Sequence, residues 1–88
     1  MADRLSECQA DMRILTDAAD DIERTLRAVD ATCSPDTWSG PAGDRFREEW
    51  AKHRSAIRAA LDDARDQVQA ITARVKREEE QARAAATT

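Results

Sequence analysis

Apolar side chains recur at alternating intervals of three and four residues along the first third of the chain. This spacing predicts an amphipathic α-helix with a coiled-coil stripe, because a strand would alternate with a period of two residues. No Gly or Pro interrupts the stripe. We therefore expect a helix over about residues 3–33, with a stripe of Leu5, Cys8, Met12, Leu15, Ala19, Ile22, Leu26, Val29 and Cys33.

A second stripe predicts a second helix, over about residues 41–82. The interval of eleven residues from Trp50 to Leu61 locally relaxes the left-handed supercoil that a strict heptad repeat imposes. Residues 83–88 have no apolar anchor, so we expect a flexible tail there. The stripe consists of Phe46, Trp50, His53, Ile57, Leu61, Ala64, Val68, Ile71 and Val75.

Residues 34–40 separate the two stripes and predict a turn. Pro35 disfavours helical backbone at Ser34, and Pro41 is tolerated at the first position of the next helix. Ser39 or Gly40 can serve as its N-cap. Two long helices joined by a short turn must lie antiparallel if their stripes are to meet. The predicted fold is therefore all-α, with residues 1–88 forming a single antiparallel helix-turn-helix hairpin.

A lone two-helix hairpin covers each stripe from one side only. The ~1.5–3 kcal/mol available from fully burying an aliphatic side chain is then only partly realised, while ordering costs about 1.5 kcal/mol per residue. Further apolar positions lie beside the stripes, at Ile14 and Ala18 on the first helix and at Ala56 and Ala60 on the second. We therefore expect the hairpin to dimerise into a four-helix bundle.

Composition narrows the class of function. The net charge of −4 argues against a nucleic-acid partner or an anionic membrane, since both require a dense basic surface. The N-terminal residues turn amphipathic at once and lack the apolar region of a signal peptide, and no stretch reaches the roughly 18 apolar residues of a membrane span. We expect a protein made in the cytoplasm, without stable membrane insertion.

Trp38 is a large apolar side chain in an otherwise polar turn. Its indole can fold back over the end of the helix pair, with Gly40 leaving room for the chain to reverse. Two interpretations stay open: Trp38 plugs the end of the core, or it also serves as a recognition anchor, a common role of Trp at interfaces.

The motif Trp38-x-Gly40-x-Ala42, followed by Phe46 and Trp50 between two amphipathic helices, resembles the Trp-x-Gly (WXG) family. These are the early-secreted-antigen-like proteins of type VII secretion systems in actinobacteria and other Gram-positive bacteria. The resemblance covers nearly the whole chain. It implies a hairpin that forms a homodimeric or heterodimeric four-helix bundle and leaves the cell through the type VII machinery without a cleaved signal peptide.

The sequence departs from that family at one point, because it contains no Tyr. Many family pairs carry a Tyr-x-x-x-Asp/Glu export signal after the second helix of one partner. Either a partner supplies that signal, or the chain is a cytoplasmic targeting chaperone that pairs with the helical leader of a larger secreted effector toxin. A structural coiled-coil module without a role in secretion is the third hypothesis.

The remaining reactive side chains predict no catalytic, metal or cofactor site. Cys8 and Cys33 lie ~38 Å apart on one helix, too far for a disulfide within the chain; pairing across an antiparallel homodimer is the less favoured alternative to two small buried side chains. Neither forms a zinc-ligand spacing with His53. His53 is a candidate pH-sensitive residue of the stripe, because its protonation would put charge into the bundle. Without a nucleophile–base pair or a phosphate-binding loop, we expect no enzyme.

Overall fold

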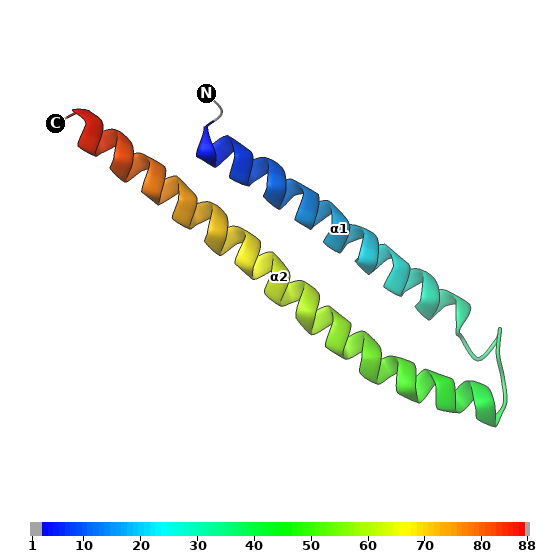
Figure 1. Ribbon diagram of the computed structural model, residues 1–88. Helices are drawn as coiled ribbons and strands as arrows, with labels where there is room; N and C mark the ends of the chain where they lie inside the picture. The colour runs from blue at the N-terminus through cyan, green and yellow to red at the C-terminus, as the bar shows by residue number, and fades with distance from the viewer. Residues whose placement is uncertain (1–2, 88) are drawn as a thin grey trace.

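A computed structural model of the chain describes residues 3–87, which fold into two long helices joined by one turn. Helix α1 spans Arg4–Thr32 and helix α2 spans Pro41–Thr87, with no strand among the described residues. The helices run antiparallel, side by side, in an elongated hairpin of 72 × 19 × 12 Å (Figure 1). The predicted all-α hairpin is confirmed.

The ends of α1 follow from local hydrogen bonding. The Asp3 side chain accepts a hydrogen bond from the Leu5 backbone N–H at 3.1 Å, which satisfies one of the donors left free in the first helical turn. At the other end the N–H of Cys33 donates to the Val29 carbonyl oxygen at 2.9 Å. Asp3 and Cys33 thus cap the helix at the two ends of the predicted range.

Helix α2 extends farther than the sequence predicts. It begins at Pro41 and continues through Thr87, whereas we expected residues 83–88 to form a flexible tail; Thr88 lies outside the described residues. The segment Ala84–Ala86 explains the difference, since Ala has the highest intrinsic helix propensity and needs no tertiary contact to favour helical backbone. An ion pair of 2.6 Å between Arg4 and Glu78 places the start of α1 level with that part of α2. Residues 79–87 therefore project beyond α1 (Figure 1).

The core of the hairpin is a thin line of side chains between the helices. Only four hydrophobic residues in the described range are buried: Ala19, Leu26, Leu61 and Val75. Three of them form one cluster near the middle, against which Trp50 and Ile57 pack. Neither described helix is long and apolar enough to cross a membrane.

Candidate functional site

The turn is held together mainly by backbone contacts of Trp38. Its N–H donates to the Ser34 carbonyl oxygen at 3.0 Å, and its own carbonyl oxygen accepts from Arg47 Nη1 at 2.6 Å. The indole lies against Phe46, with ring centroids 5.3 Å apart, and remains 42% exposed. Trp38 therefore covers the turn end of α2 while offering part of its ring to the outside.

Two glycines make this turn sterically feasible, each in a different way. Gly40 has φ +102°, in the region that side chains disfavour. Gly43 has helical backbone but lies beneath Trp38, and a Cβ built on it would come within 2.7 Å of the Trp38 carbonyl oxygen. Gly40 was expected from the sequence, whereas the role of Gly43 was missed. The available signal was a glycine in the first turn of a helix, where it would otherwise only lower stability.

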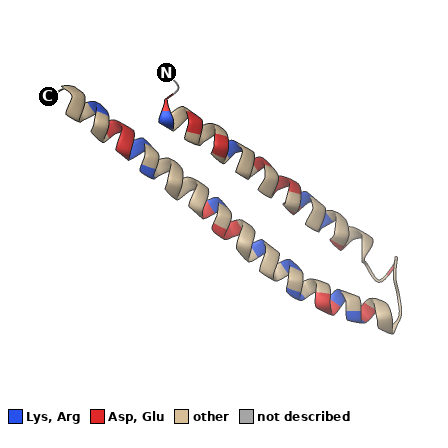
Figure 2. Ribbon diagram, in the orientation of Figure 1, with Lys and Arg blue, Asp and Glu red and all other residues tan. Residues whose placement is uncertain are grey.

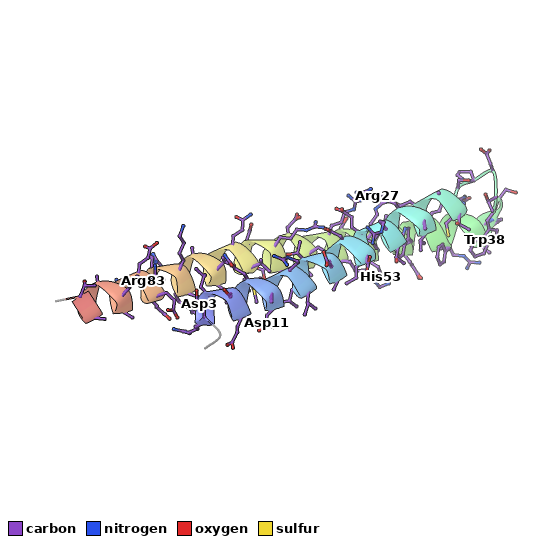
Figure 3. All side chains as sticks on the ribbon, turned by 90° about the horizontal axis from the view of Figure 1, so that it is seen from above. Asp3, Asp11, Arg27, Trp38, His53 and Arg83 are labelled. Atoms are coloured by element: carbon purple, nitrogen blue, oxygen red, sulfur yellow. The ribbon has the colours of Figure 1, made fainter. Side chains whose placement is uncertain are left out.

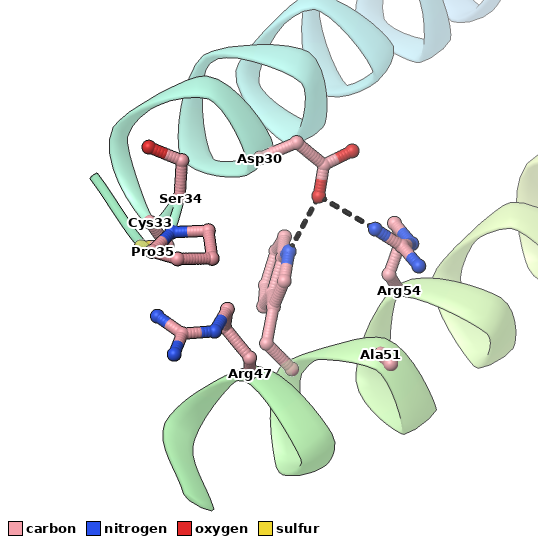
Figure 4. Close-up of a pocket in the computed structure, with 8 residues that line it drawn as sticks. Asp30, Cys33, Ser34, Pro35, Arg47, Ala51 and Arg54 are labelled. Atoms are coloured by element: carbon pink, nitrogen blue, oxygen red, sulfur yellow. Dashed lines mark hydrogen bonds and ion pairs between the residues drawn. The ribbon is translucent and has the colours of Figure 1, made fainter. Parts of the chain in front are cut away.

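A polar cluster closes the hairpin next to the turn (Figure 4). Asp30 Oδ1 accepts hydrogen bonds from the indole N–H of Trp50 at 2.7 Å and from Arg54 Nη1 at 2.9 Å. The bond from Trp50, followed by the bond and charge of Arg54, holds the pKa of the Asp30 carboxyl below its ordinary value of 3.8. From the sequence we expected Trp50 to contribute only packing, and Asp30 was not singled out.

An open cavity of about 370 Å³ lies beside this cluster and includes Cys33, Pro35 and Arg47 in its lining. Two of its cations already have partners, because Arg54 pairs with Asp30 and Arg47 pairs with Asp44. No group of three or more His, Cys, Asp or Glu in residues 3–87 could hold a metal ion. The lining of the cavity therefore combines the Asp30–Arg54 ion pair with the free thiol of Cys33.

Ion pairs continue along the same side of the hairpin. Arg65 binds Asp20 at 2.9 Å and Glu23 at 3.4 Å, and these two carboxylates, Asp20 first, raise the pKa of the guanidinium above its ordinary value. We call the side formed by Asp20, Glu23, Asp30, Arg54 and Arg65 the ion-pair face. Acidic and basic turns occur on both helices along the hairpin (Figure 2).

The heptad stripe of α1 divides into two lines, since residues seven apart return to the same side of a coiled-coil helix. One line, formed by Leu5, Met12, Ala19 and Leu26, faces α2, and its last two members are buried. We call it the seam line. The other line contains Leu15 and Ile22, which remain 53% and 46% exposed. Val29 and Cys8 lie on this second line and are half-buried.

Helix α2 divides in the same way. Its seam line contains Leu61, Val68 and Val75, while Ile57, Ala64 and Ile71 form the neighbouring line. Ala64 is exposed, and Ile57 and Ile71 are half-buried. Phe46, nearer the turn, is half-buried beside Trp38.

The second lines of the two helices lie on one side of the hairpin. On both helices, each residue of the second line lies four positions before or three positions after a buried residue of the seam line. Glu23 and Arg65 instead lie four positions after a buried residue of the seam line. Because Glu23 and Arg65 pair across the helices, the two second lines must share the opposite side. We call this side the apolar face: Leu15, Ile22 and Val29 of α1 with Ile57, Ala64 and Ile71 of α2.

Exposed residues at the border of the apolar face agree with this orientation. Asp11 and His53 lie on one side of the hairpin and Arg27 on the other (Figure 3). His53 is exposed in the hairpin, and Ile14 is 68% exposed. The ion pair between Arg4 and Glu78 lies toward the end of the hairpin opposite the turn. The apolar face is therefore a continuous strip bounded by polar groups, a shape suited to contact with another helix pair.

Both cysteines are free thiols and half-buried. Cys8 lies near the start of α1 and Cys33 at its end, so the hairpin keeps them at opposite ends of one helix. Within residues 3–87, neither comes together with His53 of α2 in a metal-ligand group.

Comparison of the chain with protein-family models, with curated proteins and with solved structures finds no significant match.

Proposed function

We propose that this chain is a non-enzymatic interaction protein that pairs its apolar face with a second helical hairpin in a four-helix bundle. The exposure of Leu15 and Ile22 carries this proposal. Both belong to an unbroken heptad stripe, yet the partner helix within the chain leaves them about half uncovered. In a four-helix bundle each helix packs against two neighbours, and the apolar face supplies the second contact.

We further propose that the bundle is a substrate of a type VII secretion system and is exported as a folded dimer. The resemblance of Trp38-Ser39-Gly40 to the Trp-x-Gly motif supports this step. The geometry of the turn is compatible with it, because Trp38 packs on Phe46 and Gly40 adopts positive φ. On this proposal the protein is made in the cytoplasm and then secreted without cleavage of a signal peptide.

A second candidate function is a cytoplasmic chaperone that pairs with the helical leader of a larger effector toxin. The absence of Tyr from the sequence favours it, since a partner would then have to supply the export signal. Both candidates use the same apolar face and differ in the partner and in the final location of the chain.

Fractionation of the native producer separates the candidates. Accumulation of the intact chain in the culture supernatant, lost when the type VII machinery is inactivated, supports the secreted dimer. Retention in the cytoplasm together with a larger co-purifying protein supports the chaperone.

Variants of the apolar face test the pairing itself. Ile22→Asp should abolish the dimer in sedimentation and also reduce export. Arg13→Asp, an exposed charge change on the same helix but away from the apolar face, is the matched control and should retain both. If Ile22→Asp dimerises as tightly as the control, the apolar face is not the pairing surface.

A further inference from the structure

The open cavity at the turn end of the hairpin is lined by one face of α2 and by the end of α1 (Figure 4). The lining residues of α2 are Arg47, Trp50, Ala51 and Arg54, whose spacing of three and four residues places them on a single helix face. Ala51 is the smallest of the four, so the space above it stays open between its longer neighbours. The volume of about 370 Å³ lies within the range of cavities that bind small molecules.

The charged groups of the lining leave one positive charge in excess, because Arg47 and Arg54 face Asp30 alone. Asp30 accepts its hydrogen bonds from Arg54 at 2.9 Å and from the indole of Trp50 at 2.7 Å. Arg47 also pairs with Asp44, but that side chain is 71% exposed and lies outside the lining, so solvent screens its charge. The cavity therefore favours a ligand with a single negative charge over a neutral one.

Arg47 has donors left for that charge. A guanidinium carries five N–H bonds; one of those of Arg47 donates to the carbonyl oxygen of Trp38 at 2.6 Å and another to Asp44, which leaves three. The same two contacts hold the side chain in place, and it is only 24% exposed. A carboxylate matches the planar fork of a guanidinium, which can donate two parallel hydrogen bonds to it. At Arg54, by contrast, a carboxylate would be repelled by Asp30.

Apolar groups complete the lining of the cavity. Trp50 contributes its ring and Ala51 its methyl group, while Cys33 and Pro35 close the cavity from the end of α1 and the turn. Cys33 and Pro35 lie on the same side of the cavity as Arg47 (Figure 4). An apolar body attached to a carboxylate at Arg47 would therefore be covered by these side chains.

We infer that this cavity is a binding site for a small monocarboxylate with an apolar body, such as an aromatic acid, whose carboxylate pairs with Arg47. A dianion such as phosphate fits less well, because its second charge would face Asp30 and it has no apolar part to cover. The site belongs to the single hairpin, since all eight lining residues come from one chain. It requires neither the proposed pairing of apolar faces nor export.

Titration with benzoate, followed through the indole N–H signals in NMR, tests the inference. The chain has two tryptophans, of which Trp50 lines the cavity and Trp38 does not. We expect benzoate to shift the Trp50 signal saturably and more than the Trp38 signal, with a dissociation constant of about 1 mM for so small a ligand. Benzamide, which has the same shape without the charge, should bind about tenfold more weakly or less. Benzoate should also slow alkylation of Cys33 by iodoacetamide, but not that of Cys8 near the other end of α1.

Two pairs of variants locate the site. Ala51→Leu fills the cavity without removing a polar group and should abolish benzoate binding, whereas Ala59→Leu, at an exposed position of α2, should retain it. Arg47→Lys keeps the positive charge but loses the planar fork, so it should weaken binding about tenfold. Arg45→Lys, the same change at an exposed position, is its control and should bind benzoate as the wild type does.

Three results would overturn the inference: no saturable shift of the Trp50 signal, equal binding of benzamide and benzoate, or full binding by a folded Ala51→Leu variant. The benzamide comparison and the alkylation of Cys33 need only the wild-type chain, so they decide the question even if a variant loses helical circular dichroism. Sedimentation of the same sample measures pairing separately. A failed titration therefore leaves the proposed pairing intact, and a monomer in sedimentation leaves the binding site intact.

Discussion

At the scale of single residues, the turn and its polar cluster set the geometry of the hairpin. Asp30 ties α1 to α2 through Trp50 and Arg54, residues 20 and 24 positions away along the chain. Trp38 ties the turn to α2 through its carbonyl oxygen. Contacts between residues so far apart along the chain depend on the register of the two helices, so no spacing in the sequence indicates them. Gly40 was predictable because it follows a proline-containing break; Gly43 was not, because its role depends on where Trp38 folds.

Replacing Asp30 should lower the stability of the hairpin at neutral pH. It should also make that stability less sensitive to acid. The pKa of this carboxyl is lowered in the folded state, so its contribution is complete above the ordinary value of 3.8 and is lost as the pH falls through the lowered value. Asp30→Asn should therefore melt at a lower temperature at pH 7 and lose less stability than the wild type between pH 5 and pH 2. Asp21→Asn, which removes a pair within one exposed helix face, is the control. Equal acid sensitivity of wild type and Asp30→Asn would contradict this role.

Gly43→Ala should destabilise the turn end of the hairpin by about 1–3 kcal/mol, because the added methyl group meets backbone rather than a flexible side chain. Denaturant unfolding measures the change. Ser39→Ala, at an exposed turn position, serves as control and should stay within ~0.5 kcal/mol of the wild type. If the Gly43→Ala variant is as stable as the control, Trp38 does not need to lie over Gly43.

At the scale of elements, the heptad stripes predicted both helices and the turn between them. They could not predict the rotation of each helix, because a heptad stripe consists of two lines and either of them can face the neighbouring helix. The structure resolves this choice: Ala19 and Leu26 face α2, whereas Leu15 and Ile22 lie to the side. The ion pairs of Arg65 fix the same rotation, and they too required the register of the two helices.

Leu26 and Ile22 should respond differently to truncation. Leu26 is 3% exposed, so Leu26→Ala should cost ~2–4 kcal/mol at any protein concentration. Ile22 is 46% exposed in the hairpin, and Ile22→Ala should lower stability mainly at concentrations where the dimer forms. Unfolding curves at two concentrations far apart measure both effects. A cost of Ile22→Ala that is independent of concentration would contradict the rotation of α1 described above.

At the scale of the whole molecule, the hairpin has two unlike sides. The ion-pair face is already satisfied by contacts between α1 and α2, while the apolar face is bounded but uncovered. A thin core of four buried hydrophobic residues in the described range gives the single hairpin little burial to offset its conformational entropy. Pairing through the apolar face would cover its exposed side chains and would bury more apolar surface. For this reason we propose that the protein functions through assembly.

His53 is exposed in the single hairpin, so its role as a pH-sensitive residue of the stripe stays a prediction.

Sedimentation equilibrium of the purified chain at neutral pH tests the proposed assembly most directly. We predict a folded species of twice the chain mass of 9.8 kDa, which dissociates on dilution together with loss of helical structure. A monomer that remains helical and melts cooperatively would contradict this prediction, because the apolar face would then need no partner.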